Sequence, residues 1–214
     1  MTRVRVDLNI SLDGFVTTTD QTPENPFGDD WPRLTHAYAA TRTFRSRVLG
    51  DTSGAGTTGV DDDYAAQYFE GIGAEIMGAW MFGFHSVPDD PQWTGWWGDE
   101  PPFGVPVFVL THRQLESIPM QGGTIFHFLS ASPADVLEKA TAVAGDQDVR
   151  IGGGASTVRE FLRAGLVDDL HVAVVPIILG RGIRLWDDLR GIENGARVSA
   201  VAAPSGVTHI TFNR

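Results

Sequence analysis

Residues 148–172 read DVRIGGGASTVREFLRAGLVDDLHV. The run VRI predicts a strand and ASTVREFLRAG predicts a helix, with three glycines at the junction. A helix N-terminus has unpaired N–H groups and the positive end of the helix dipole, and glycine lets a phosphate approach the backbone. The junction therefore predicts a pyrophosphate site, to which the hydroxyls of Ser156 and Thr157 would contribute. A tight turn without a ligand is the alternative.

Strands and helices alternate on both sides of this junction. RVRVDLNISLDGF, residues 3–15, alternates apolar and polar residues and predicts a first strand that ends at Asp13. The remaining expected elements are a loop over 17–32, helices from about Leu34 to Val48 and over 61–73, 132–145 and 155–165, strands over 74–78, 105–111, 123–129 and 149–154, a long strand over 168–179, and an antiparallel pair over 196–203 and 207–213. This order predicts one α/β domain, residues 1–214, with a mostly parallel central sheet and antiparallel C-terminal strands.

The composition excludes several classes of protein. A formal net charge of -11 argues against a nucleic-acid partner, because phosphates need a basic face. The chain contains no cysteine, so disulfides, thiolate metal sites and a cysteine nucleophile are excluded. Its six histidines show no paired metal spacing, so we expect no metal. The N-terminus lacks a signal-peptide pattern and no apolar run could cross a bilayer, so we expect a cytoplasmic protein without membrane contact.

The glycine junction is a poor match to a Rossmann site, because its glycines come late and Asp168 and Asp169 precede the next strand instead of ending it. RIGGGASTVREFLRAGLVDDLHVAVVPIILGRGIRLWDDL, residues 150–189, resembles instead the C-terminal reductase domain of bacterial riboflavin biosynthesis proteins. NISLDGF and EIMGAWMFG also fit this family, which belongs to the dihydrofolate reductase-like superfamily. The resemblance covers the chain except roughly 17–60 and 86–104.

The resemblance implies a dihydrofolate reductase-like fold with helices on both faces of the sheet, and NADPH at the carboxyl ends of the strands. It also implies a homodimer. Where the family often has an arginine after MG, this chain has Ala79, which leaves the preference for NADPH over NADH open. The implied cofactor-binding residues are Gly78 at one helix start, Thr111, His112 and Arg113 near the adenosine 2′-phosphate, and Gly152, Gly153, Gly154 and Ala155 at the pyrophosphate.

The expected helix from Leu34 to Val48 contains no Asp or Glu, although dihydrofolate reduction in the superfamily requires a carboxylate from this helix. True dihydrofolate reductase activity is therefore not expected. Asp13 is the candidate for the proton relay, or else a turn residue. The run Asp61-Asp62-Asp63 fits the first turn of a helix, and one of its carboxylates could instead reach the site.

Two further groups are candidates for substrate binding. Arg42 and Arg45 can share a helix face that meets an anionic group of the substrate, or they are solvated surface arginines. Trp96 and Trp97 lie in a loop rich in Gly and Pro, where they either wall a flat heteroaromatic ligand or fill a small core.

The sequence as a whole predicts an NAD(P)H-dependent reductase of a small heteroaromatic or carbonyl substrate, similar to 5-amino-6-(5-phosphoribosylamino)uracil reductase. The zinc deaminase activity of bifunctional riboflavin proteins is excluded, because its motif requires cysteines. The alternative is a nucleotide-binding or sensor protein that kept the fold without turnover, and both Ala79 and the helix without acids favour it.

Overall fold

The computed structural model describes residues 2–17, 19–22, 24–85, 87 and 90–214. A nine-stranded sheet runs through it in the order β10-β11-β8-β1-β7-β3-β4-β6-β5. The strands of this sheet are β1 (Val4–Ser11), β3 (Ile72–Gly78), β4 (Pro106–Leu110), β5 (Ile118–Pro119), β6 (Ile125–Leu129), β7 (Asp148–Gly153), β8 (Asp169–Val175), β10 (Arg197–Ala202) and β11 (Thr208–Asn213). A separate two-stranded ribbon pairs β2 (Phe15–Thr17) with β9 (Ile183–Arg184).

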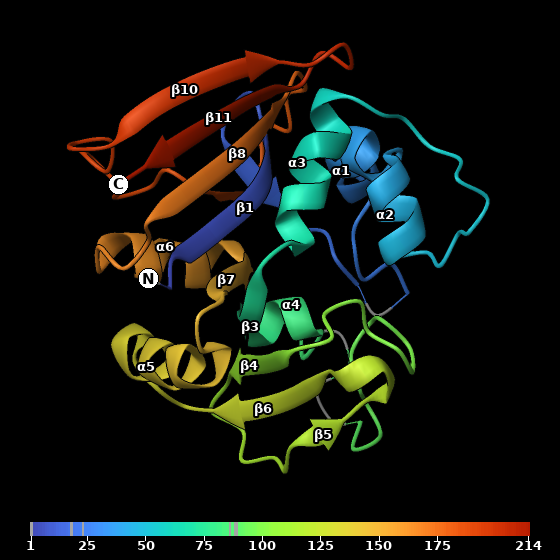
Figure 1. Cartoon of the computed structure of the whole chain (residues 1–214), viewed down its shortest axis with the longest axis vertical. Helices are drawn as coiled ribbons and strands as arrows, with labels where there is room; N and C mark the ends of the chain where they lie inside the picture. The colour runs from blue at the N-terminus through green and yellow to red at the C-terminus, as the bar shows by residue number, and fades with distance from the viewer. Residues whose placement is uncertain (1, 18, 23, 86, 88–89) are drawn as a thin grey trace.

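Six neighbouring strands, from β8 to β6, are parallel. The pairs outside them, β11 with β8, β10 with β11 and β5 with β6, are antiparallel. This confirms the predicted mostly parallel sheet with antiparallel C-terminal strands. The carboxyl ends of β7, β3 and β4 lie side by side, because these strands are adjacent and parallel. In Figure 1 the sheet crosses the molecule, with α5 and α6 on the left and the first three helices on the right.

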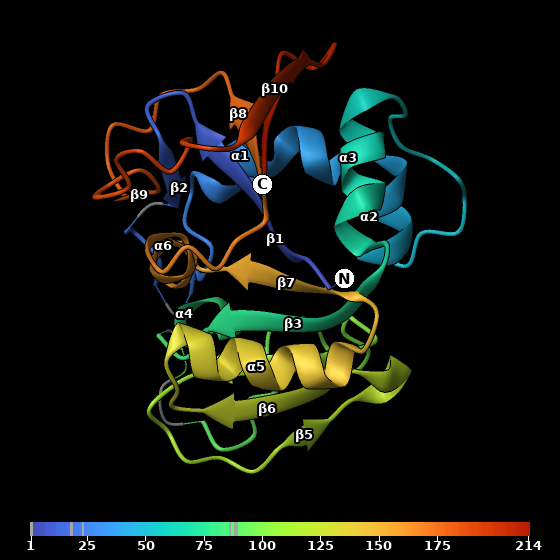
Figure 2. The same ribbon diagram turned by 60° about the vertical axis from the view of Figure 1, so that its left-hand side comes forward.

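One face of the sheet carries the main core. Helices α5 (Pro133–Ala144) and α6 (Ala155–Arg163) cover it, as the rotated view of Figure 2 also shows. Ser132 caps α5 by accepting a hydrogen bond from the Asp135 N–H, as its Ser-Pro start predicts. The buried residues of this core include Val6, Ile76, Ile151, Val136, Val158 and Phe161. Burial of these side chains supplies most of the hydrophobic stabilisation of the sheet.

The opposite face carries α1 (Trp31–Ala39), α2 (Arg42–Arg47) and α3 (Val60–Phe69). The single helix predicted from about Leu34 to Val48 is wrong, because the chain forms two helices with a break at Thr41. The Thr41 backbone is extended, its hydroxyl accepts from the Phe44 N–H, and it bridges to Thr57. A threonine that caps a helix in this way ends the preceding helix and starts a new one.

Two other segments differ from expectation. The long strand predicted over 168–179 ends at Val175, because Pro176 has no N–H to continue the ladder. The tryptophan loop, residues 90–104, covers a second apolar cluster around Phe82 and Phe126 next to α4 (Ala79–Phe82). A one-turn 3-10 helix, η1 (Gln121–Gly123), precedes β6. Among the described residues, no helix combines the length and apolar character needed to cross a bilayer.

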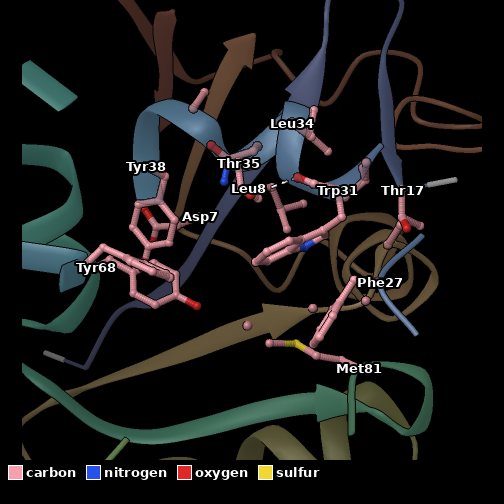
Figure 3. Close-up of a pocket in the computed structure, with 18 of the residues that line it drawn as sticks. Asp7, Leu8, Thr17, Phe27, Trp31, Leu34, Thr35, Tyr38, Tyr68 and Met81 are labelled. Atoms are coloured by element: carbon pink, nitrogen blue, oxygen red, sulfur yellow. Dashed lines mark hydrogen bonds between the residues drawn. The ribbon is translucent and has the colours of Figure 1, made fainter. Parts of the chain in front are cut away.

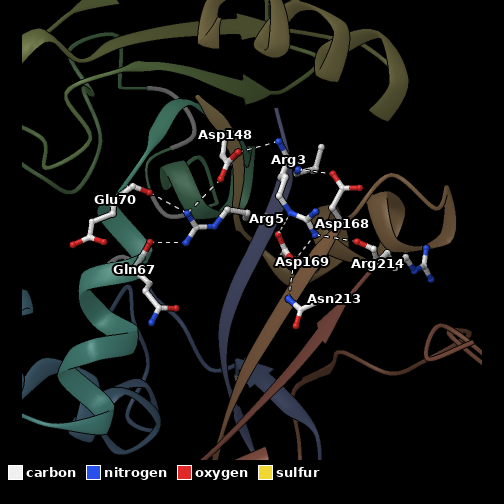
Figure 4. A network of polar contacts seen from close by, with 10 residues as sticks. Arg3, Arg5, Gln67, Glu70, Asp148, Asp168, Asp169, Asn213 and Arg214 are labelled. Atoms are coloured by element: carbon white, nitrogen blue, oxygen red, sulfur yellow. Dashed lines mark hydrogen bonds and ion pairs between the residues drawn. The ribbon is translucent and has the colours of Figure 1, made fainter. Parts of the chain in front are cut away.

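Ion pairs tie the amino ends of the central strands together (Figure 4). The Arg3 guanidinium donates to both carboxylate oxygens of Asp169, at 2.5 and 2.7 Å, and Asn213 donates to the same carboxylate at 2.7 Å. Arg5 donates to the carbonyl oxygens of Gln67 and Glu70 at the end of α3. These contacts fix the amino edge of the sheet, whereas the carboxyl edge is left open for the site described next.

Candidate active site

A cavity of about 490 Å³ lies on the face of the sheet that carries α1 and α3. Its lining comes from β1, β8, β11 and the carboxyl end of β7, from helices α1 to α4, and from the loops on either side of them. Figure 3 shows Tyr38 and Tyr68 on one side of this space and Phe27, Trp31 and Met81 on the other. The volume and the apolar walls with a few polar groups are typical of small-molecule sites.

The glycine bay, residues 152–156, forms one wall of the cavity. Helix α6 begins here, and Gly154 at its N-cap position leaves the first turn without a side-chain cap among the described residues. A Cβ at Gly154 would meet no atom within 4 Å. Gly153 has a φ of 136°, a conformation that favours glycine. The open space before an uncapped helix N-terminus fits a diphosphate group.

Two residues predicted to contact the cofactor lie outside the cavity lining. Gly78 ends β3 and is buried, and the Thr157 hydroxyl occupies the space where a Cβ at Gly78 would project. Thr157 is itself buried. The structure therefore assigns this pair to close packing between β3 and α6, in place of the predicted direct contacts with a pyrophosphate.

Thr111, His112 and Arg113 follow β4 at the same edge of the sheet as the glycine bay, but do not line the cavity. The ring Nδ1 of His112 lies 3.1 Å from the Ser130 hydroxyl, and the Arg113 guanidinium lies 4.5 Å from the centre of the Phe84 ring. Their contact with a 2′-phosphate stays a prediction.

Both tryptophans predicted to bind substrate line the cavity, and both also hold the tryptophan loop in place. Trp96 donates its indole N–H to the Met81 carbonyl oxygen at 3.1 Å. Trp97 packs edge-on against Phe103 and stacks on Phe126, with ring centres 4.9 and 5.9 Å away. Trp96 and Trp97 therefore fit both interpretations left open by the sequence, because each lines the cavity and each also packs within the tryptophan loop.

The basic face of α2 points away from the cavity. Arg45 forms an ion pair with Asp51 at 2.6 Å, and Arg42 is exposed. Among the described residues of this segment, Phe44 and Val48 line the cavity and the arginines do not. The structure thus favours the interpretation of Arg42 and Arg45 as surface residues, because the apolar face of the helix takes the inner side.

Asp13 also lies outside the cavity lining, and its carboxylate anchors a turn. It accepts hydrogen bonds from the Ser11 hydroxyl at 2.6 Å and from the Leu179 and Gly180 N–H groups at 3.1 and 2.7 Å. Burial raises the pKa of Asp13, but these hydrogen bonds outweigh it and lower the pKa to about 2. A carboxyl that stays ionised at neutral pH has no proton to donate, so the geometry favours the turn interpretation.

Carboxylates reach the cavity from other elements. Asp7 comes from the middle of β1 and Asp61 from the first turn of α3, so one member of the acidic run does reach the site. The Asp7 carboxylate oxygen Oδ1 lies 3.0 Å from Nδ1 of His171. Nε2 of His171 lies 2.9 Å from Nδ1 of His209, whose Nε2 lies 3.0 Å from Oδ1 of Asp61. All four residues line the cavity.

Sequence reasoning missed Asp7, His171 and His209, although a signal for them existed. Asp7 is one of the polar positions of the alternating strand predicted over residues 3–15. On β8, His171 stands between the apolar Leu170 and Val172, and on β11 His209 is buried next to Ile210. Strands β1, β8 and β11 are adjacent. Polar residues that recur at the same depth on neighbouring strands indicate a buried polar site rather than a solvated face.

Comparison with known proteins agrees with this geometry. The model of the RibD C-terminal domain matches residues 2–202. The chain belongs to the RibD C-terminal domain family. The resemblance found in the sequence is thereby confirmed.

Solved structures share the fold of this RibD C-terminal domain at low sequence identity. A putative riboflavin biosynthesis protein from Shewanella sp. PV-4 is 21% identical with a TM-score of 0.63, and the match covers 100% of this chain and 99% of that one. RibD from Acinetobacter baumannii is 16% identical with a TM-score of 0.53, and this chain spans 58% of it. Dihydrofolate reductase from Enterococcus faecalis, complexed with NADP(H), is 12% identical with a TM-score of 0.50, covering 99% and 96% of the two chains.

A curated relative, the uncharacterized protein YyaP from Bacillus subtilis, is 33% identical over 67 residues. The match covers 31% of this RibD C-terminal domain chain and 36% of the length of YyaP. Together the comparisons show a reductase-like fold of the dihydrofolate reductase type.

Proposed function

We propose that this protein is an NADPH-dependent reductase that transfers a hydride to a small, planar heteroaromatic or carbonyl substrate. The observation that carries the proposal is the continuity of one cavity, which is lined at once by the glycine bay and by the polar groups of β1, β8 and α3. A dinucleotide held at the bay would supply hydride chemistry, and the protein would position the substrate against it.

The walls support a flat substrate. Phe27, Trp31, Tyr38 and Tyr68 present aromatic rings to the cavity (Figure 3), and flat ligands bind between such rings. Asp7 lies beside Tyr38 and offers a carboxylate to hydrogen-bond donors of the ligand. A pyrimidine of the 5-amino-6-(5-phosphoribosylamino)uracil type combines a flat ring with such donors, and it is the first substrate to test.

The proposal is tested first by NADPH binding. A fluorescence titration of the wild-type protein with NADPH is expected to show saturable binding, and NADH is titrated in parallel because of Ala79. Gly154→Leu fills the open space of the bay and is expected to weaken NADPH binding at least about tenfold, since a bulky side chain would keep the diphosphate away from the helix N-terminus. Ala164→Leu places the same side chain at the exposed other end of α6 and is the matched control.

Turnover is then measured as NADPH oxidation with 5-amino-6-(5-phosphoribosylamino)uracil and a panel of heteroaromatic and carbonyl compounds. Oxidation by the wild-type protein, reduced in Gly154→Leu and retained in Ala164→Leu, supports the reductase. Binding without oxidation of any compound would favour the nucleotide-binding alternative. Absence of NADPH binding would contradict both functions.

A further inference from the structure

Four side chains form one continuous hydrogen-bonded chain across the floor of the cavity. We call this set of residues the proton chain. It crosses the adjacent strands β1, β8 and β11, ends on α3, and consists of Asp7, His171, His209 and Asp61. Its three links measure 3.0, 2.9 and 3.0 Å between heavy atoms. The Tyr64 ring stacks on both imidazoles, at 4.4 and 4.1 Å between ring centres and 12° and 3° between planes. The stacked Tyr64 ring and the carboxylates at both ends thus hold the two imidazoles of the proton chain in position.

The number of hydrogens in this chain follows from its geometry. Ionised carboxylates only accept, so the links at Asp7 and Asp61 each need a hydrogen on the facing ring nitrogen. The link between the two rings needs a third hydrogen. Two neutral imidazoles carry only two hydrogens, so the complete chain holds one additional proton, either on the histidine pair or on a carboxyl group. Loss of this proton breaks one of the three links.

The surroundings of the chain lower the pKa of His209. Burial lowers the pKa of His209 most strongly, the hydrogen bond to Asp61 raises it, and a charge on His171 lowers it. At the inner end, Oδ2 of Asp7 is buried without a hydrogen-bond partner among the described residues. Other titratable or charged groups lie near the chain on every element packed against it. They are Tyr64 and Glu70 on or after α3, Tyr38 on α1, Tyr68 with the buried Glu75–Arg150 pair beyond Asp7, and Arg5, Asp148 and Asp169 on β1, β7 and β8.

The two ends of the chain have different neighbours, although the side chains of Asp7 and Asp61 are similarly little exposed, at 12% and 14%. Asp61 also accepts a hydrogen bond at 3.2 Å from the hydroxyl of Ser205, an exposed residue in the turn before β11. Asp7 lines the cavity beside Tyr38 (Figure 3). The chain therefore links the protein surface with the place where we put the substrate.

We propose that the Asp7–His171–His209–Asp61 chain stores one proton and delivers it to the substrate during reduction. This inference rests on the proposed reductase function. A bound NADPH would supply the hydride for the carbon of a C=O or C=N bond and would leave as NADP⁺. Asp7 passes the proton to the oxygen or nitrogen of that bond. The chain is then one proton short, and water at the Asp61 and Ser205 end restores it.

Two measurements test this inference, and the first needs no substrate. In protein with ¹⁵N-labelled histidine, we expect three hydrogen-bonded ring protons on His171 and His209, and one shared titration step for both rings. In His209→Gln we expect His171 to titrate alone. His127 on β6 serves as the reference histidine in the same spectra. Its ring contacts the Ser117 hydroxyl, and it lies outside the cavity lining.

The second measurement is single-turnover oxidation of saturating NADPH with 5-amino-6-(5-phosphoribosylamino)uracil, or with whichever panel compound the wild-type protein reduces fastest. His171→Gln and His209→Gln are expected to slow hydride transfer at least about 100-fold and to leave the NADPH dissociation constant within about twofold, since general acid catalysis contributes at this scale. His127→Gln is expected to keep the wild-type rate and pH profile. Asp61→Asn changes only the link between His209 and Asp61, so it is expected to shift the pH profile of the hydride-transfer rate. This variant is the deciding one if His209→Gln does not fold.

The outcomes separate the two proposals. Wild-type rate and pH profile in His209→Gln, or in Asp61→Asn where His209→Gln does not fold, would overturn the proton chain and leave the reductase standing. Two independent titration steps for His171 and His209 would overturn the chain as well. Failure of the wild-type protein to oxidise NADPH with any compound would overturn the reductase, and the delivery of a proton with it.

Discussion

Gly152 lies against the carboxylate of Glu75, so that a Cβ at position 152 would overlap Oε1 of that side chain. Glu75 is fully buried on β3 and pairs with Arg150, which is itself buried and lies with its guanidinium 3.5 Å from the centre of the Tyr68 ring. The glycine bay therefore rests on a buried ion pair, and this pair extends to a tyrosine in the cavity wall. Burial raises the pKa of Glu75, and the Arg150 guanidinium opposes that rise.

Gly152→Ala is expected to destabilise the protein by about 1–3 kcal/mol, because the added methyl group forces the Glu75 carboxylate away from its position. Gly154→Ala is the matched control, since the same atom enters open space there. Urea unfolding measures both free energies. Equal stability of the two variants would contradict the packing of Gly152 on Glu75.

Glu75→Gln is expected to cost about 3–5 kcal/mol, because it leaves the Arg150 guanidinium buried without a counter-charge. Arg150→Met should be costly for the converse reason. The double variant is expected to lose less than the sum of the two single losses, as a double-mutant cycle by urea unfolding would show. Strict additivity would mean that the pair is not coupled.

Asp13→Asn should lower the free energy of unfolding by about 1–2 kcal/mol at neutral pH, because an amide replaces an ionised acceptor of three hydrogen bonds. The pKa of Asp13 is lowered to about 2 in the folded state, so its contribution is present above the unfolded pKa near 3.9 and is lost as the pH falls toward 2. Unfolding at pH 7, 5 and 3.5 should show a difference from wild type that shrinks with acidity. The exposed Asp146→Asn is expected to show no such trend.

Trp97→Ala is expected to destabilise the protein by about 2–3 kcal/mol, because it removes the ring packed between Phe103 and Phe126. Trp96→Phe loses one hydrogen bond to the Met81 carbonyl and is expected to cost about 1 kcal/mol. Thermal unfolding compares the two. Unchanged stability in Trp97→Ala together with lost ligand binding would assign the ring to the ligand and not to the small core.

Arg42→Ala and Arg45→Ala are expected to leave the KM for the reduced compound unchanged, because neither arginine lines the cavity. Phe44→Ala, on the inner face of the same helix, is expected to raise this KM. The NADPH oxidation assay compares all three variants. A higher KM in Arg42→Ala would show that the basic face of α2 meets the substrate after all.

Much of the fold could be read from local patterns. The alternation in β1, the Ser-Pro start of α5 and the glycines before α6 each depend on neighbouring residues alone, so the elements were predicted close to where they form. The break at Thr41 was missed, because the residues on both sides continue a helical pattern. Thr41 ends that pattern only through its contacts with Phe44 and Thr57, the second of which is distant in sequence.

The candidate site divides in the same way. Gly152, Gly153, Gly154, Ala155 and Ser156 lie next to one another in the chain and come together in the bay as the sequence indicates. Asp13, Arg42 and Arg45 are suitable chemical groups near the right elements, but their side chains are taken up by turns or point outward. Whether a side chain faces a cavity depends on strand register and helix rotation, and these are set by packing against distant segments.

The sequence by itself determined the α/β pattern, the family and the glycine junction, because helix termini, strand alternation and turns are governed by interactions between near neighbours. Only the tertiary structure brought Asp7, Asp61, His171 and His209 into one hydrogen-bonded line. These residues are up to 202 positions apart. The adjacency of β11, β8 and β1, with α3 packed over them, places each within about 3 Å of the next. Hydrogen bonds require this proximity, and no local rule of sequence supplies it.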